Sequence, residues 1–207
     1  MEQRTEEWFA ARLGKVTASR VADVVAKTKS GVAASRANYM AELICERLTG
    51  RKGEGFTNAA MEWGTEQEPH ARAAYEAHMG LLVTEVGFAT HPSIKASGAS
   101  PDGMVVEAQR DGLIEIKCPN TATHLDLWLT KVIPAKYITQ MQWQMACTGT
   151  EWCDFVSYDP RLPEHLQLFI KRVPRNGAAI ATLETEVMAF LVELDQKVAK
   201  LQEKTNG

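Results

Sequence analysis

Two acidic residues and a lysine stand on either side of what resembles a β-hairpin. Asp102 precedes the apolar run 103–106, and Glu115 and Lys117 follow a polar turn with one isoleucine between them. Two converging carboxylates could hold a hard cation such as Mg²⁺, which takes oxygen ligands and keeps several waters. A lysine beside that ion could orient a metal-bound water or help to deprotonate it. The pattern therefore indicates a possible metal site that activates water.

The same residues could instead form a cross-strand ion pair on a solvated hairpin. Spacing alone favours the ion pair, because Glu-x-Lys is common on exposed strands, where such pairs contribute little stability. The segment 112–118 is, however, apolar at Leu113 as well as at Ile114 and Ile116, and it ends in a cysteine. The acids thus lie within an otherwise buried strand, where an unpaired charge is expensive. This context favours the metal site.

A hairpin can bring these side chains together. Alternate residues of a strand point to the same face, so Glu115 and Lys117 share one face while Ile114 and Ile116 share the other. We expect strands within 81–92, 103–108 and 113–118, and the Asp-Gly dipeptide in "RDG" favours a tight turn between the last two. With Asp102 at the start of one strand, the two carboxylates would converge at one end of the sheet.

Helical spacing of apolar residues dominates the rest of the chain. We predict helices within 5–14, 18–31, 34–50 and about 59–79, the last with a kink or restart near Gly64 and Pro69. Further helices are expected at 121–130, 135–148 and 178–204, with strands within 151–159 and 165–173. The apolar stripe of the final helix predicts a core or subunit contact. The fold class is α/β, with a central mixed β-sheet flanked by helices.

Composition sets limits on the class of protein. The 207 residues, 45% hydrophobic and 24% charged, predict a single globular domain over 1–207. A net charge of −3 does not indicate a nucleic-acid binder, although a carboxylate-rich metal site would itself lower that charge. The four cysteines form no CxxC pair, which argues against a zinc or redox motif. The sequence has neither an apolar signal core nor a stretch that could span a membrane, so we expect a cytoplasmic protein.

Six motifs occur in an informative order: "WFAARLGKVTASR", "MEWGTEQEPHARAAYE", "SPDG", "IEIKCP", "YITQMQW" and "YDPR". In order and approximate spacing they resemble the YqaJ-like viral recombinase nucleases, the family of phage lambda exonuclease within the PD-(D/E)xK superfamily. The resemblance extends from Trp8 to about Arg161. It implies a restriction-endonuclease-like core, a helical N-terminal region and a phage or prophage origin.

The resemblance also implies roles for the residues of the hairpin. Asp102 and Glu115 would be the central metal ligands, with the backbone carbonyl of Ile116 as a further ligand. Lys117 would position the attacking water. The cofactor would be Mg²⁺, with two ions expected and Mn²⁺ possible, because both accept the same oxygen ligands.

Two helical segments would complete the catalytic site. Glu68 matches the acid that completes the metal site in this family, although Thr65-x-x-Glu68 could also be a capping box at a helix start. Gln140 resembles the family's active-site glutamine. We expect Gln142 and Gln144 to be solvent or packing residues, and we assign none of the five histidines to a metal.

Other positions match residues that bind a DNA end in this family. Arg12, Ser19 and Ser100 would hold a terminal 5′-phosphate, although Ser19 could instead cap a helix and Arg12 could be an ordinary surface arginine. Met61 and Lys29 fall where the family places a strand-separating wedge and its basic partner. Both differ from the leucine and arginine expected there.

The resemblance implies a Mg²⁺-dependent 5′→3′ exonuclease that degrades one strand of duplex DNA from a phosphorylated end and leaves a 3′ overhang. It further implies a ring-shaped homotrimer threaded by DNA, with basic residues lining the channel, and a single-strand annealing protein as partner. Two alternatives stay open. One is an endonuclease on the same core; the other is a DNA-binding protein without catalytic activity, which would usually have lost an acid or the lysine.

Overall fold

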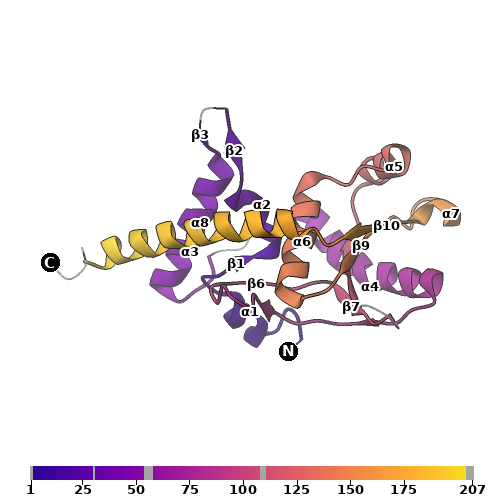
Figure 1. Ribbon diagram of the computed structural model, residues 1–207. Helices are drawn as coiled ribbons and strands as arrows, with labels where there is room; N and C mark the ends of the chain where they lie inside the picture. The colour runs from indigo at the N-terminus through magenta and orange to yellow at the C-terminus, as the bar shows by residue number, and fades with distance from the viewer. Residues whose placement is uncertain (1, 30, 54–57, 108–110, 204–207) are drawn as a thin grey trace.

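A computed structural model describes residues 2–29, 31–53, 58–107 and 111–203 (Figure 1). Its helices are α1 (Glu6–Arg12), the 3₁₀ helix η1 (Ala18–Arg20), α2 (Val21–Val24), α3 (Ala34–Thr49), α4 (Ala59–Met79), α5 (Thr121–Thr130), α6 (Ala135–Thr148), α7 (Glu164–Gln167) and α8 (Gly177–Glu203). Its strands are β1 (Val16–Thr17), β2 (Lys27–Thr28), β3 (Gly31–Val32), β4 (Val83–Thr84), β5 (Ala89–Thr90), β6 (Ser97–Ala99), β7 (Gly103–Val105), β8 (Gly112–Lys117), β9 (Trp152–Tyr158) and β10 (Leu168–Pro174).

A five-stranded mixed sheet, ordered β10-β9-β8-β7-β4, lies at the centre of the site-bearing part of the molecule. Only the β8–β9 pair in this sheet is parallel. The predicted hairpin is present: β7 and β8 are antiparallel, with Gly103 opposite Ile114. Part of the "RDG" turn, Arg110, lies outside the described residues.

Helices cover both faces of this sheet, as the apolar pattern predicts. On one face, Ala71 and Tyr75 of α4 pack against Ile114 and Ile116 of β8. On the other face, α5 and α6 cover Leu113 and form a second apolar cluster. Since Glu115 and Lys117 share the face of Leu113, they lie beneath α6. The α/β fold with helices around a mixed sheet is therefore confirmed.

The N-terminal helices, α6 and α8 form a separate core. It contains Tyr39 of α3 and Trp143 of α6. It also contains four residues of the predicted stripe on α8, namely Leu183, Val187, Phe190 and Leu194. The stripe thus serves as core over most of its length, while Leu201 near its end is exposed. A second, three-stranded sheet, ordered β1-β6-β5, lies beside this core.

The structure differs from the predicted elements at several points. The helix expected over 18–31 ends at Val24, and a β-hairpin (β2 and β3) follows, aided by Gly31, whose φ of 130° few other residues can adopt. This hairpin projects from the body of the molecule (Figure 1). The strand expected over 81–92 is two short strands, β4 and β5, which belong to different sheets. Strand β6 and helix α7 were not predicted.

Helix α4 runs without interruption through Gly64 and Pro69, so the predicted restart is wrong. It begins after Asn58, whose side chain accepts a hydrogen bond from the Met61 N–H at 2.9 Å. Thr65 therefore lies inside the helix, and the capping-box interpretation of Thr65 and Glu68 does not hold.

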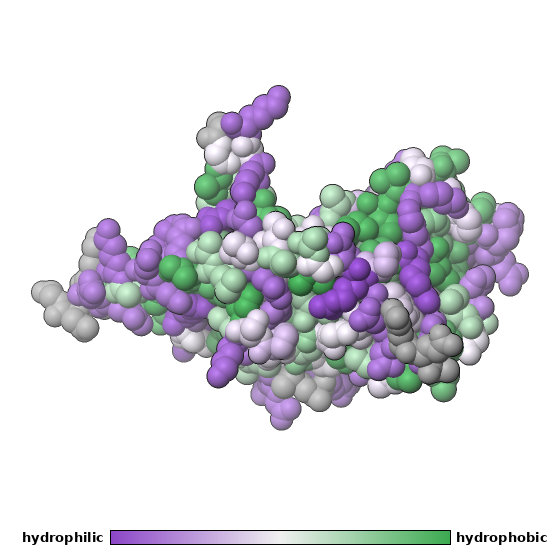
Figure 2. All heavy atoms as spheres, in the orientation of Figure 1, coloured by the Kyte–Doolittle hydropathy of each residue, from purple (hydrophilic) through white to green (hydrophobic). Residues whose placement is uncertain are grey.

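Surface character varies along the molecule (Figure 2). Hydrophilic residues dominate the far part of α8, whereas apolar residues gather around α5, where Leu129 and Val132 are exposed. Within the described ranges, no helix combines the length and apolar character needed to cross a membrane.

Candidate active site

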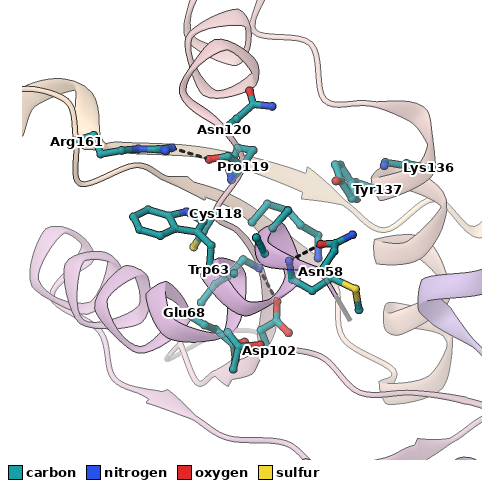
Figure 3. Close-up of a pocket in the computed structure, with 17 residues that line it drawn as sticks. Asn58, Trp63, Glu68, Asp102, Cys118, Pro119, Asn120, Lys136, Tyr137 and Arg161 are labelled. Atoms are coloured by element: carbon teal, nitrogen blue, oxygen red, sulfur yellow. Dashed lines mark hydrogen bonds between the residues drawn. The ribbon is translucent and has the colours of Figure 1, made fainter. Parts of the chain in front are cut away.

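A cavity of about 950 Å³ opens between the N-terminal half of α4, the end of β8 and the start of α6 (Figure 3). Four of the predicted site residues line it: Glu68, Asp102, Ile116 and Lys117. They come from two elements, α4 and β8, and from the loop before β7. The fold therefore brings together residues that are up to 49 positions apart in the sequence.

Asp102 is fixed at the end of the sheet by the backbone of the neighbouring strand. Its Oδ2 accepts a hydrogen bond from the Ile116 N–H at 2.7 Å. Gly103, the next residue, leaves room for the Val83 side chain of β4, because a Cβ there would lie 2.1 Å from it. Burial, and then the nearby Glu115 carboxylate, raise the pKa of Asp102 well above its usual value. Burial and the neighbouring carboxylate thus both disfavour the charged form of Asp102.

Glu115 lies beneath the cavity and is completely buried. Its Oε1 accepts a hydrogen bond from Gln140 Nε2 at 2.6 Å and forms an ion pair with Lys117. Its Oε2 accepts a hydrogen bond from Gln144 Nε2, also at 2.6 Å. Each carboxylate oxygen therefore has an amide donor, which compensates for the loss of water.

Lys117 pairs with Glu115 and lines the cavity together with Asp102. Burial on its own would lower the pKa of Lys117, but the Glu115 and Asp102 carboxylates outweigh it and raise that pKa. Its Nζ also lies 5.3 Å from the centre of the Tyr137 ring. The neighbouring carboxylates therefore keep Lys117 protonated, and its ammonium group can donate a hydrogen bond into the cavity.

Gln144 is the residue that the sequence interpretation missed. We expected it to be a solvent or packing residue, but it binds Glu115 and is buried against Cys153, whose Sγ lies 4.0 Å from Gln144 Oε1. The available signal was its spacing, since residues four apart share one face of a helix and Gln140 faces the site. Gln142 does serve as a packing residue, bonding to the backbone of Pro174.

Glu68 reaches the same cavity from α4 and is engaged by two arginines. Arg4 Nη2 lies 2.8 Å from one carboxylate oxygen, and Arg72 Nη2 lies 3.5 Å from the other. Arg72 also donates a hydrogen bond to the Asp102 carbonyl at 3.2 Å. The N-terminal segment is held nearby, because Gln3 Nε2 donates to the Val86 and Pro101 carbonyls, each at 2.7 Å.

The donor set suits a hard divalent cation. Among the described residues, no three acidic, histidine or cysteine side chains are clustered closely enough to hold a metal by themselves. Mg²⁺ is commonly bound through only one or two carboxylates, with waters completing its coordination. Asp102, Glu115 and the Ile116 carbonyl offer such oxygens, and a cation would offset the burial and the repulsion from Glu115 that raise the pKa of Asp102. The residues present therefore fit a magnesium ion.

A second cavity of about 330 Å³ contains Arg12 and Ser19. Arg12 Nη1 donates a hydrogen bond to Ser100 Oγ at 3.0 Å, and its guanidinium lies over the Trp8 ring at 4.1 Å. Trp8 Nε1 donates to the same Ser100 oxygen at 2.9 Å. Ser19 is exposed and makes no helix-capping bond. These three predicted end-binding residues are therefore close together, and Arg12 is not an ordinary surface arginine.

Met61 connects the two cavities, because its side chain lines both and is 54% exposed. Lys29 is exposed in the turn of the β2–β3 hairpin and lines neither of these cavities. The structure thus places Met61, but not Lys29, between the acidic and the basic site.

The chain was compared with known proteins. Residues 7–151 match the model of the YqaJ-like viral recombinase domain. None of the curated proteins matches the chain significantly. Crystal structures of LHK-Exo, an alkaline exonuclease from Laribacter hongkongensis, are 60% identical over 98% of both chains, with a TM-score of 0.90 for the complex with dAMP and 0.89 for another crystal. A phage-related exonuclease from Haemophilus somnus shares the fold, with a TM-score of 0.73 and 18% identity over 90% of this chain and 96% of its own. This chain therefore belongs to the family of YqaJ-like viral recombinase domains and is a nuclease of that family.

Proposed function

We propose that this nuclease is a Mg²⁺-dependent 5′→3′ exonuclease that degrades one strand of duplex DNA from a 5′-phosphorylated end and leaves a 3′ overhang for strand annealing. The observation that carries the proposal is the convergence of Asp102, Glu115 and Lys117 at one cavity, with a separate basic cavity beyond Met61. An exonuclease needs both a place for the scissile phosphate and a place that recognises an end.

The acidic cavity accounts for the chemistry. Asp102, Glu115, the Ile116 carbonyl and Glu68 would hold two metal ions. When bound, such ions lower the pKa of a water and stabilise the departing oxygen in an in-line displacement. Lys117 would orient the attacking water by donating a hydrogen bond.

Two glutamines would maintain the geometry of this cavity. Gln140 and Gln144 would fix the Glu115 carboxylate from below, one at each oxygen. Their amides keep this buried acid hydrogen-bonded, so that its orientation is set before substrate binds.

The basic cavity accounts for the recognition of ends. Arg12 offers a charged fork for a terminal phosphate, and Ser19 and Ser100 offer hydroxyl donors. Met61 would separate the strands as a wedge, and Lys29 would be its basic partner on the projecting hairpin. The crystal of LHK-Exo with dAMP supports this proposal, because a mononucleotide is the kind of product that such an enzyme releases.

We further propose that residues 1–207 form one nuclease domain, which assembles as a homotrimer around DNA and works with a single-strand annealing protein. A DNA substrate and four free cysteines agree with action in the cytoplasm. Basic residues would line the channel of the ring, which reconciles DNA binding with a net charge of −3.

The test is a timed digestion of linear duplex DNA labelled separately at each 5′ and 3′ end, with closed circular DNA as control. We expect early release of the 5′ label, no cutting of the circle, and loss of activity in Lys117→Ala but not in Lys200→Ala, which removes an exposed lysine of α8. Cutting of the circle would favour the endonuclease alternative. Full activity of Lys117→Ala would contradict the site assignment.

A further inference from the structure

Arg161, in the "YDPR" motif, lies at the rim of the larger cavity and has no part in the chemistry described above. It lines this cavity together with Trp63, Pro119 and Lys136 (Figure 3). The acids Glu68 and Asp102 lie on the α4 side of the same cavity. The rim therefore carries two cations, Arg161 and Lys136, and faces Glu68 and Asp102, which form the acidic floor of the cavity.

The guanidinium of Arg161 is held in place on one edge. Its Nε lies 2.7 Å from Oδ1 of Asp159, and its Nη2 lies 3.0 Å from Oδ2 and 3.1 Å from the Pro119 carbonyl. Asp159 is completely buried, and hydrogen bonds from Arg161 lower its pKa despite the opposing effect of burial. The ionised aspartate thus keeps the arginine in one orientation.

The opposite edge of the guanidinium is available to a ligand. The side chain is 46% exposed, and its plane lies over the Trp63 ring at 4.8 Å. Within the described part of the chain, Nη1 has no hydrogen-bond partner. A guanidinium fixed on one side and free on the other needs little further ordering to bind a phosphate oxygen.

Lys136 adds a second cation at this rim. It is exposed, and its Nζ lies 4.8 Å from the centre of the Tyr137 ring. Lys117 Nζ lies 5.3 Å from the centre of the same ring. These cations line the same cavity as the carboxylates. They would offset the repulsion between the acidic floor and the phosphates of the substrate.

We infer that Arg161 binds a backbone phosphate of the strand being cut, adjacent to the scissile phosphate, and so positions that strand over the acidic floor, with Lys136 as a second cation across the same cavity. This inference rests on the proposed function. Its ligand is a DNA phosphodiester, held by charge and by the free N–H groups of the guanidinium.

The experiment compares the parent with Arg161→Ala and with Lys200→Ala, which removes the same charge from the exposed surface of α8. Digestion kinetics of linear duplex DNA give KM and kcat, and fluorescence anisotropy in EDTA gives the affinity for the same DNA over a range of salt concentrations. For Arg161→Ala we expect KM to rise about tenfold with kcat within about twofold. The slope of log K against log salt should fall by about 0.9. Lys200→Ala should match the parent in all three quantities.

The salt slope separates phosphate binding from a purely structural role, because loosening the loop at Pro119 would not change the number of counterions released. If Arg161→Ala fails to fold, Arg161→Gln carries the same expectation, since its amide can still donate to the Pro119 carbonyl. A folded variant with the parent's KM and slope overturns the inference, as does a loss of kcat with an unchanged slope. A parent that does not digest DNA would overturn the proposed function, while its anisotropy would still test Arg161.

Discussion

Gln144 Nε2 donates a hydrogen bond to Oε2 of Glu115 at 2.6 Å, and both side chains are fully buried. A neutral residue beneath the cavity therefore determines how a carboxylate of the proposed active site is oriented. Because Gln144 takes Oε2, the other oxygen is left to Gln140 and Lys117. The orientation of Glu115 is thus set before any metal or DNA arrives.

Replacing Gln144 by methionine should impair the site. We expect Gln144→Met to need about tenfold more Mg²⁺ for half-maximal activity, because Glu115 loses the donor that orients it. Titration of activity with Mg²⁺ measures this. Gln142→Met is the matched control, since it also removes a buried amide from α6 and should cost about 1–3 kcal/mol of stability. The positioning role is refuted if both variants show the same metal dependence as the parent.

Asp102 should destabilise the protein when no metal is bound. Its pKa is raised in the folded state, so its charged form opposes folding, and this cost grows as pH rises from about 4 through the folded-state pKa. We expect Asp102→Asn to be inactive but more stable than the parent in EDTA at pH 7, by about 1–2 kcal/mol. Thermal unfolding between pH 4 and 8 measures the difference, which should vanish at the acidic end. Added Mg²⁺ should raise the Tm of the parent and not that of the variant.

Glu68 should contribute to metal binding despite its pairing with Arg4 and Arg72. We expect Glu68→Gln to raise the Mg²⁺ concentration for half-maximal digestion about tenfold, because one oxygen donor loses its charge. Glu66→Gln, an exposed acid two residues earlier on α4, is the control for loss of charge. Equal Mg²⁺ requirements for the two variants would place Glu68 outside the metal site.

Arg12 should determine the preference for phosphorylated ends. We expect Arg12→Ala to reduce the ratio of digestion rates on 5′-phosphate and 5′-hydroxyl duplexes about tenfold, since a charge-assisted hydrogen bond to the phosphate is lost. Arg51→Ala removes an exposed arginine and should leave the ratio unchanged. If Arg12→Ala retains the parent's ratio, the smaller cavity does not recognise the phosphate.

The parts of the fold that the sequence predicted are those with strong local signals. Helices over 121–130 and 135–148 agree with the structure at both ends, because Asn120, Pro134 and Gly149 mark their limits. The β7–β8 hairpin follows from apolar strands that flank a turn. In long, periodic or clearly bounded segments, the local sequence is sufficient to predict the secondary structure.

The errors occurred where tertiary contacts decide the outcome. We predicted a helix as far as residue 31, yet Lys27 and Thr28 pair with Val32 and Gly31 as a hairpin, in which Gly31 has a φ of 130°. Strand β6 is only three residues long and contains Gly98, where a Cβ would lie 2.3 Å from Phe88. Neither feature has a periodicity that a sequence pattern could reveal.

For the site, the sequence placed Asp102, Glu115 and Lys117 on the correct hairpin, because strand alternation fixes which side chains share a face. The four-residue spacing from Gln140 was the one sign that Gln144 faces Glu115, and the rotation of α6 against the sheet, which brings both amides to this carboxylate, could not be predicted. Nor did the sequence indicate that Arg4 reaches Glu68 across 64 positions of the chain.

The segment around Gln3 and Arg4 has a practical consequence for anyone who prepares the enzyme. These residues bind the loop before Asp102 and the carboxylate of Glu68, so the N-terminal segment holds two parts of the proposed catalytic site in place from outside the larger cavity. The final turns of α8 point away from that site (Figure 1). A purification tag or a fluorescent fusion attached after α8 would leave these contacts intact, whereas one attached before Gln3 would lie next to them.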